Sequence, residues 1–390
     1  MEKNLSKIIT NTMFECNSYA CRCMKDIENM VPGEAPQTTL KLYSDIEEPL
    51  HFSYMPKEGL NLTGSAGGVI EHNILGKLLS IPADDIDKHI EFFEKYGFFH
   101  PLSFDEYASV DASVILSVSN HIRTTIRLMN ALGKRDYKSM LIHASFLLFS
   151  NPVEYSTSES TYSTCPHTFT SLINNAPLFP DVNQNHEVQA TGCISIFDHI
   201  TNKKNPITIK CINAIRSGEG TDLEGSKSPW FKNIVALYLM DNDSDEDLRL
   251  IVDFFYHIFT ENGVFDEVEY SKIKPYGKLN IDKLSAEMKD ALVKISRILI
   301  AEEINYNIQG IHPKYNGKQL SATWQVGTLI EAIYFSVFYM KPGIEIYKEC
   351  ENPNCKRDKY FLVEATRTNK KYCCQQCANA AAAQRHRNRK

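Results

Sequence analysis

Five of the chain's eleven cysteines lie between Cys350 and Lys390, and their spacing suits a metal ion. Four residues separate Cys350 from Cys355, while Cys377 follows Cys374 after two residues and Cys373 after three. A tetrahedral zinc ion takes four soft ligands, usually two short-range pairs that a turn brings together. The spacing therefore predicts a Zn²⁺ site made by Cys350, Cys355, Cys377 and either Cys373 or Cys374.

The residues after the last cysteine predict a short helix with a basic end. Alanine, the strongest helix former, dominates residues 378–383. The segment from Lys348 to Lys390 carries a formal charge of +7 and the remainder −13, which gives the net charge of −6. Four zinc-bound thiolates and their metal would lower the tail to about +5. The charge of the tail remains positive, so this part of the chain is expected to attract a polyanion.

Cations at the end of this helix can contact phosphates of DNA or RNA, with an affinity that falls as salt rises. They are not confined to one helix face, which favours contact with the nucleic-acid backbone over the reading of bases. The alternative is a frayed, solubilising terminus whose cations complement the helix dipole. The candidate nucleic-acid-binding residues are Arg385, Arg387, Arg389 and Lys390.

The finger, residues 346–390, resembles the CGNR-type zinc finger found at the C-terminus of many bacterial proteins. The resemblance rests on the first cysteine pair, on Phe361, on Tyr372-Cys373 and on Cys377-Ala378-Asn379. Alignment on Tyr372 implies that Cys373 is the third ligand and Cys374 the alternative. Proteins of this family are described as stress-induced transcription regulators or RNA-binding zinc-ribbon-like proteins. The resemblance thus implies nucleic-acid binding, and it is specific over about forty residues only.

Two positions depart from the family pattern. Ala378 replaces the usual Gly of the naming motif, and Ala380 replaces the usual Arg. Any role of that Arg therefore does not carry over to this chain.

Cysteines near the N-terminus raise the question of a second metal. Cys16, Cys21 and Cys23 lie close in sequence, but no Cys or His pair follows them at short range. We therefore favour the interpretation that they are small buried apolar residues, with a second metal site as the alternative. Cys165 and His167 form only a weak candidate for a nucleophile and its base, because they lie in a polar loop.

The composition excludes several classes of protein. No run of eighteen apolar residues is present, and the N-terminal residues lack the apolar segment of a signal peptide. We expect a cytoplasmic protein with no membrane segment and with reduced thiols. With 390 residues, the chain is long enough for two or three domains.

The part of the chain that must position the finger is predicted to have an α+β fold, which is mainly α with small β-hairpins. We expect a helical N-terminal body in residues 1–150 with a hairpin near 38–55, a polar loop or linker in 151–190, an α+β region in 191–345 that ends in a buried helix, and the finger. Helices are predicted at 5–31, 84–97, 103–132, 137–149, 244–258, 281–305 and 323–339, and a second hairpin at 193–211.

These observations predict a zinc-containing nucleic-acid-binding protein that regulates transcription or a stress response, with a body that senses a signal or mediates assembly. The first alternative is a protein-interaction module that forms a homo-oligomer or binds a protein partner, and whose zinc finger is a structural staple. The second is an enzyme with an unrecognised active site in the N-terminal body. The chain has no recognisable nucleophile motif or phosphate loop, so we expect no catalysis.

Overall fold

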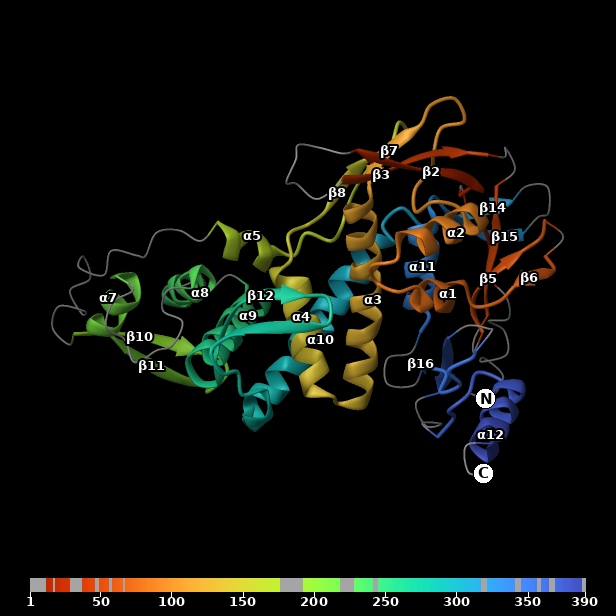
Figure 1. Cartoon of the computed structure of the whole chain (residues 1–390). Helices are drawn as coiled ribbons and strands as arrows, with labels where there is room; N and C mark the ends of the chain where they lie inside the picture. Colours follow the sequence, from red (N-terminus) through yellow and green to blue (C-terminus); the bar gives the residue numbers. More distant parts are fainter. Residues whose placement is uncertain are drawn as a thin grey trace. The chain divides into compact units, whose positions relative to one another are not determined.

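The structure is a computed structural model that describes residues 12–16, 18–28, 37–45, 49–55, 58–65, 67–175, 192–217, 228–240, 245–316, 321–340, 345–355, 359–364 and 369–387. Within these residues the fold is a mixture of helices and small, mostly antiparallel sheets (Figure 1). Contacts divide the chain into two compact units. Unit 1 comprises Met1–Gly133, Val153–Cys165 and Glu303–Lys390, and unit 2 comprises Lys134–Pro152 and Pro166–Glu302.

Unit 1 contains a six-stranded sheet whose strands come from both ends of the chain. Its order is β14-β15-β1-β4-β5-β6, and the β1–β15 pair is parallel whereas the others are antiparallel. The N-terminal part of the chain is thereby tied to a segment three hundred residues later. The bounds are β1 Thr12–Cys16, β4 His51–Met55, β5 Gly59–Thr63, β6 Val69–Glu71, β14 His312–Asn316 and β15 Ser321–Val326.

A second sheet of unit 1 has the order β2-β3-β7, with β2 Cys21–Glu28, β3 Gln37–Ser44 and β7 Ala108–Asp111. The short hairpin of β8 Glu154–Ser156 and β9 Thr161–Ser163 also belongs to this unit. The described helices of unit 1 are α1 Ile74–Ser80, α2 Ile86–Tyr96, α3 Ala112–Lys134, α11 Leu329–Phe338, α12 Gln375–Arg387 and the end of α10 Ala286–Asn307.

Helix α11 shows how the sequence fixes these elements. Thr328 accepts a hydrogen bond from the Glu331 backbone, and the Glu331 carboxylate accepts from the backbone of Gly327 and Thr328. This reciprocal arrangement is a capping box, which satisfies amide groups that a helix start leaves without partners. All but two of its side chains, Glu331 and Phe338, are buried, so the helix is a core element of unit 1.

Unit 2 is built around packed aromatic side chains. Phe149 of α4 Tyr137–Phe149 lies with its ring centroid 4.9 Å from that of Phe255 and 5.5 Å from that of Phe265. The remaining elements are α5 Thr168–Asn174, β10 Cys193–Asp198, β11 Lys203–Thr208, α7 Ile209–Ser217, α8 Pro229–Leu239, α9 Glu246–His257, the π-helix Ile258–Asn262, β12 Val264–Glu269, β13 Lys272–Tyr276, the 3-10 turn Ile281–Lys283 and most of α10.

An ionic network around the buried Asp198 and His257 links four of these elements, namely β10, α8, α9 and the π-helix. Nε2 of His257 lies 2.7 Å from an Asp198 carboxylate oxygen, and Nδ1 lies 2.5 Å from Glu261. The same Asp198 oxygen accepts from the Tyr238 hydroxyl at 2.7 Å. Although burial opposes it, the two carboxylates raise the pKa of His257 to about 9. The imidazole is therefore a cation at neutral pH.

Several predicted elements are confirmed and others are wrong. The helices predicted at 84–97, 137–149 and 244–258 are present, and so is the second hairpin, although its second strand is Lys203–Thr208 and residues 209–211 begin α7. The predicted helix at 5–31 is wrong, because strands β1 and β2 occupy residues 12–16 and 21–28. The predicted hairpin at 38–55 is also wrong, since β3 pairs with β2 and β7 while β4 pairs with β1 and β5.

Tertiary pairing explains the remaining differences. The helix predicted from residue 103 begins at Ala112, because residues 108–111 form β7 against β3. The helix predicted at 323–339 begins at Leu329, because residues 321–326 pair with two strands as β15. The predicted linker contains β8, β9 and α5, and residues 176–190 lie outside the described part of the chain.

Candidate metal centre

The finger is built from an antiparallel hairpin and the last helix. Strand β16 Glu345–Glu349 pairs with β17 Tyr360–Glu364, and helix α12 Gln375–Arg387 follows. In the register, Ile346 lies opposite Val363 and Tyr347 opposite Leu362. Because side chains alternate along a strand, these two pairs point to opposite faces of the hairpin.

Both faces of this hairpin are buried. Ile346, Val363 and Phe361 pack with Cys350 and Cys377 in one apolar cluster. On the opposite face, Tyr347 is 3% exposed and Leu362 8% exposed. A two-stranded hairpin that stood alone would leave one face in water, so the rest of unit 1 must cover the second face.

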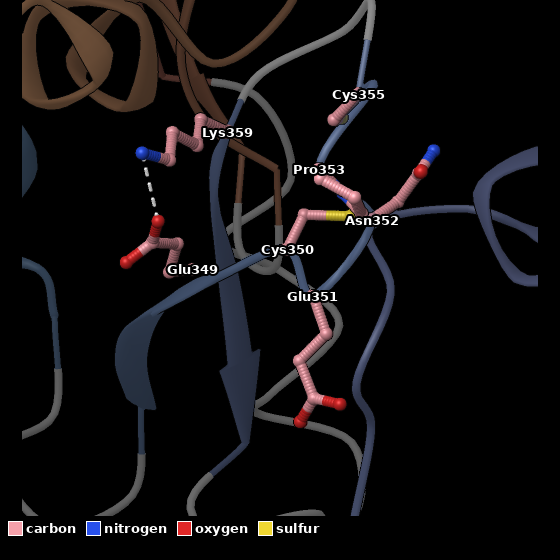
Figure 2. Close-up of a pocket in the computed structure, with 7 residues that line it drawn as sticks. All are labelled: Glu349, Cys350, Glu351, Asn352, Pro353, Cys355 and Lys359. Carbon is pink, nitrogen blue, oxygen red and sulfur yellow. Dashed lines mark ion pairs between the residues drawn. The ribbon is translucent and has the colours of Figure 1, made fainter. Parts of the chain in front are cut away.

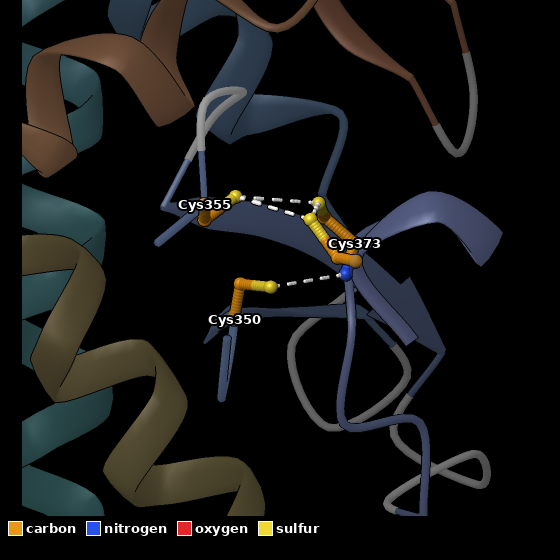
Figure 3. A group of neighbouring side chains, drawn as sticks. Cys350, Cys355 and Cys373 are labelled. Atoms are coloured by element: carbon orange, nitrogen blue, oxygen red, sulfur yellow. Dashed lines mark hydrogen bonds between the residues drawn. The ribbon is translucent and has the colours of Figure 1, made fainter. Parts of the chain in front are cut away.

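Four cysteine sulfurs converge beside the first face (Figure 3). The Sγ atoms of Cys355, Cys373 and Cys377 lie 3.5–3.6 Å apart, and those of all four, Cys350 included, lie within 4.8 Å of one another. Four sulfurs around one ion at a metal–sulfur distance of about 2.3 Å are about 3.8 Å apart. The four thiols are thus close enough to hold a metal ion.

Local backbone turns aim these sulfurs. The Cys355 amide donates to the carbonyl of Asn352 at 3.0 Å, and the buried Asn352 side chain accepts from the Asn354 amide at 3.2 Å. The Cys373 amide lies 3.5 Å from the Cys350 sulfur and donates to it. A turn within the first cysteine pair and the hydrogen bond from the Cys373 amide to the Cys350 sulfur therefore help to bring the four cysteines to one point.

Cys374 is adjacent to this group. Its Sγ lies 3.8 Å from that of Cys373, yet the mutually close set found among the described residues contains Cys373 and not Cys374. Cys374 is half-buried and directly precedes α12, and Cys377 is buried in the first turn of that helix. Cys374 therefore lies next to the four sulfurs and is not one of them.

The pKa values of the cysteines are shifted in different directions. Burial and hydrogen bonds with the neighbouring thiols raise the pKa of Cys373. The pKa of Cys350 is lowered, because backbone amide groups of Cys373 and Asn352 outweigh the opposing effect of burial. Four thiolates in one small volume repel each other, so a bound cation is the natural partner of the fully ionised set.

A pocket of about 550 Å³ opens beside Cys350 and Cys355 (Figure 2). Glu349 on its rim is paired with Lys359 at 2.8 Å, and Glu351 is paired with Lys371 at 3.2 Å. These ion pairs neutralise much of the rim charge. Two of the four cysteines, Cys350 and Cys355, line this pocket.

Three amide and hydroxyl side chains attach the hairpin to helices α1 and α3 of unit 1. Asn130 donates to the Tyr347 carbonyl at 3.0 Å and accepts from the Tyr347 amide at 3.1 Å, as a neighbouring strand would. Asn73 donates to the Tyr360 carbonyl at 2.8 Å, and the Tyr360 amide lies 3.2 Å from the Ser80 hydroxyl. These positioning residues could not be found from the sequence, because isolated polar side chains in helical segments give no signal of a distant partner.

The predicted nucleic-acid-binding residues are only partly described. Arg385 and Arg387 are exposed in the last turn of α12, and no carboxylate of the described ranges forms an ion pair with either. They are two residues apart, about 200° around the helix, so they point to different sides. Arg389 and Lys390 lie outside the described residues.

The N-terminal cysteines do not form a comparable set. Cys16 and Cys21 are buried and Cys23 is half-buried, and no group of three or more ligands in the described part of the chain includes them. The sulfurs of Cys21 and Cys23 are nonetheless 3.8 Å apart.

Comparison of the chain with protein-family models, with curated proteins and with solved structures found no match. Among the described helices, none has the length and apolar character needed to cross a membrane.

Proposed function

We propose that this protein is a zinc-containing nucleic-acid-binding protein that regulates transcription or a stress response. The observation that carries the proposal is the convergence of four thiols, whose sulfurs lie within 4.8 Å of one another. An all-sulfur tetrahedral set favours zinc or an iron–sulfur centre, and four ligands from the protein leave no open position for substrate. Zn²⁺ bound by Cys350, Cys355, Cys373 and Cys377 would be structural, so the proposal includes no catalytic role.

The nucleic-acid part of the proposal rests on α12. Cys377 anchors its first turn to the metal centre, and Arg385 and Arg387 extend from its last turn into solvent. Such cations gain affinity for phosphates by releasing counterions. Arg389 and Lys390 continue the same basic run in the sequence and belong to the proposed contact.

The remainder of the chain would sense a signal or mediate assembly with itself or with another protein. Its acidic charge of −13 opposes that of the finger, which disfavours nucleic-acid contact outside the finger. DNA and RNA are both candidate ligands, because phosphate contacts do not distinguish them.

Metal content tests the first part of the proposal. We expect one zinc per chain by elemental analysis of purified protein, and loss of that zinc in Cys355→Ser. Cys211→Ser, which removes a half-buried thiol of unit 2, is the matched control and should keep the metal. Iron with the visible absorption of an iron–sulfur cluster, or equal zinc in both variants, would refute the zinc assignment.

Salt-dependent binding tests the second part. Arg385→Ala/Arg387→Ala should weaken binding to a mixed-sequence oligonucleotide and lower the slope of log K against log salt by about 1.5, since each lost phosphate contact lowers it by about 0.7–0.9. Lys272→Ala/Lys274→Ala removes the same charge from a surface where these lysines are paired with Glu267 and Glu269, and should bind as the wild type does. Zinc-loaded protein that binds no oligonucleotide at low salt would contradict the proposal.

The attachment of the hairpin to α1 and α3 favours a second candidate function. A finger held by Asn73, Ser80 and Asn130 can serve as a structural staple for a protein-interaction module. In that case the zinc stabilises unit 1, and the arginine variants change neither stability nor partner binding. Zinc-dependent melting without nucleic-acid binding would select this candidate.

A further inference from the structure

Cys21 and Cys23 form a second thiol pair, on strand β2 of unit 1. Two residues apart on a strand, they point to the same face of the sheet, and their sulfurs are 3.8 Å apart. That face packs against helix α2, where the Cys21 sulfur lies 3.2 Å from the Phe93 carbonyl. Cys21 is 2% exposed and Cys23 is half-buried, so the pair can be reached from the Cys23 side.

The sheet opposes a disulfide between these two sulfurs. Alternate residues of a strand have Cα atoms about 6.6–6.8 Å apart, at the outer limit for a disulfide. Strand β2 pairs with β3 over eight residue pairs, including Cys21 with Ser44 and Cys23 with Leu42. Drawing the sulfurs from 3.8 Å to about 2.05 Å would distort this ladder.

A single atom between the sulfurs requires no such distortion. Two bonds of about 2.3 Å span about 4.0 Å at a trigonal angle and about 4.6 Å when they are linear, so a bound ion requires the sulfurs, now 3.8 Å apart, to separate by less than about 1 Å. No third Cys, His, Asp or Glu completes a ligand group with them in the residues that the structure describes. Ions that need four or more ligands are therefore disfavoured, and soft ions that accept two thiolates are favoured.

Ionising Cys21 leaves its hydrogen-bond partner satisfied. The Phe93 carbonyl that accepts from the Cys21 thiol also accepts from the Gly97 amide at 2.8 Å. When the thiol proton leaves, that carbonyl keeps a donor, and no buried polar group is left without a partner there. Gly97 has φ +83°, and a Cβ added at this position would clash with the Ser18 hydroxyl, so this turn requires glycine.

We propose that Cys21 and Cys23 bind one soft, low-coordinate metal ion of the Cu(I) type, as two thiolates on one strand. Binding releases two thiol protons and forms two metal–sulfur bonds, with no change in the oxidation state of the metal or of sulfur. This site is independent of the zinc proposed for the finger. It also gives a role to two cysteines that the finger does not use.

The probe is Cu(I). It is delivered to zinc-loaded protein with a competing chelator under anaerobic conditions. Copper and released zinc are counted in the same sample, and the alkylation rate of Cys23 is followed by peptide mapping. Cys23→Ser changes a half-buried position and should leave the fold intact, whereas Cys211→Ser removes an equally half-buried thiol outside the pair.

We expect one copper per chain without zinc release, and alkylation of Cys23 slowed by about tenfold or more, as a thiolate held by a metal is protected. Cys23→Ser should lose this copper and Cys211→Ser should keep it. Copper uptake matched by zinc release, with Cys23 alkylated at its original rate, would overturn the proposal, as would equal copper in Cys23→Ser. A reducible Cys21–Cys23 disulfide in place of bound copper would overturn it as well.

Discussion

Asn130 offers the sharpest test of how the finger is held. Its side-chain amide both donates to and accepts from the backbone of Tyr347, at 3.0 and 3.1 Å. Asn130→Ala removes both hydrogen bonds and leaves two backbone groups of a buried residue without those partners. Each such loss costs about 1–2 kcal/mol, so the pair should cost about 2–4 kcal/mol. This loss of stability should be local and should affect the contact between β16 and α3.

Amide hydrogen exchange of zinc-loaded protein measures this local cost. Since 1.4 kcal/mol corresponds to a factor of ten, the Tyr347 amide should exchange about 30- to 700-fold faster in Asn130→Ala. Asn130→Asp keeps an acceptor for that amide but loses the donor, and should give an intermediate rate. Asn379→Ala removes an exposed amide whose partner is Gln375 on the same helix, and should change the rate little.

Unchanged exchange at Tyr347 in Asn130→Ala would refute this reasoning. It would mean that the hairpin keeps its place through the packing of Tyr347 and Leu362 alone. Faster exchange throughout unit 1 would mean that the change destabilises the whole unit, which the comparison with Asn130→Asp would also reveal.

Two further predictions concern α1 and unit 2. Gly76→Ala would place a Cβ 2.5 Å from the Tyr360 carbonyl oxygen, so we expect about 1–3 kcal/mol of destabilisation in urea unfolding, whereas Gly68→Ala, where nothing lies within 4 Å, should change little. The folded pKa of His257, about 9, exceeds its unfolded value of about 6.5, so its stabilisation is complete below about pH 6.5 and is lost as pH rises through about 9. The melting temperature should fall over that range in the wild type and much less in His257→Gln; a parallel fall in both would contradict the assignment.

The sequence was most informative where local spacing alone determines the structure. Cysteine pairs separated by four and by three residues need only a turn to converge, and the four sulfurs do lie together. Helix α2 was predictable for the same reason, because its N-cap Asp85, its apolar spacing and its C-terminal Gly97 are all within one segment.

Long-range pairing explains what the sequence could not predict. Residues 21–28 alternate weakly, and Met24 and Ile27 are both exposed although they lie on opposite faces of the strand, which hides the two-residue period of β2. Residues 321–326 form a strand because β1 and β14 flank them, and their apolar character alone fits a helix equally well. The contacts of Asn73 and Asn130 with the finger span 287 and 217 residues of sequence.

The two buried faces of the β16–β17 hairpin have a mechanical consequence. A load applied to the end of α12 by a bound partner would pass through Cys377 to the metal centre and then across the hairpin. From Tyr347 and Tyr360 it would enter α3 and α1 through hydrogen bonds that lie across the strand direction. Tension on the C-terminus would thus be borne first by the attachment of the finger, before the central sheet of unit 1 is strained.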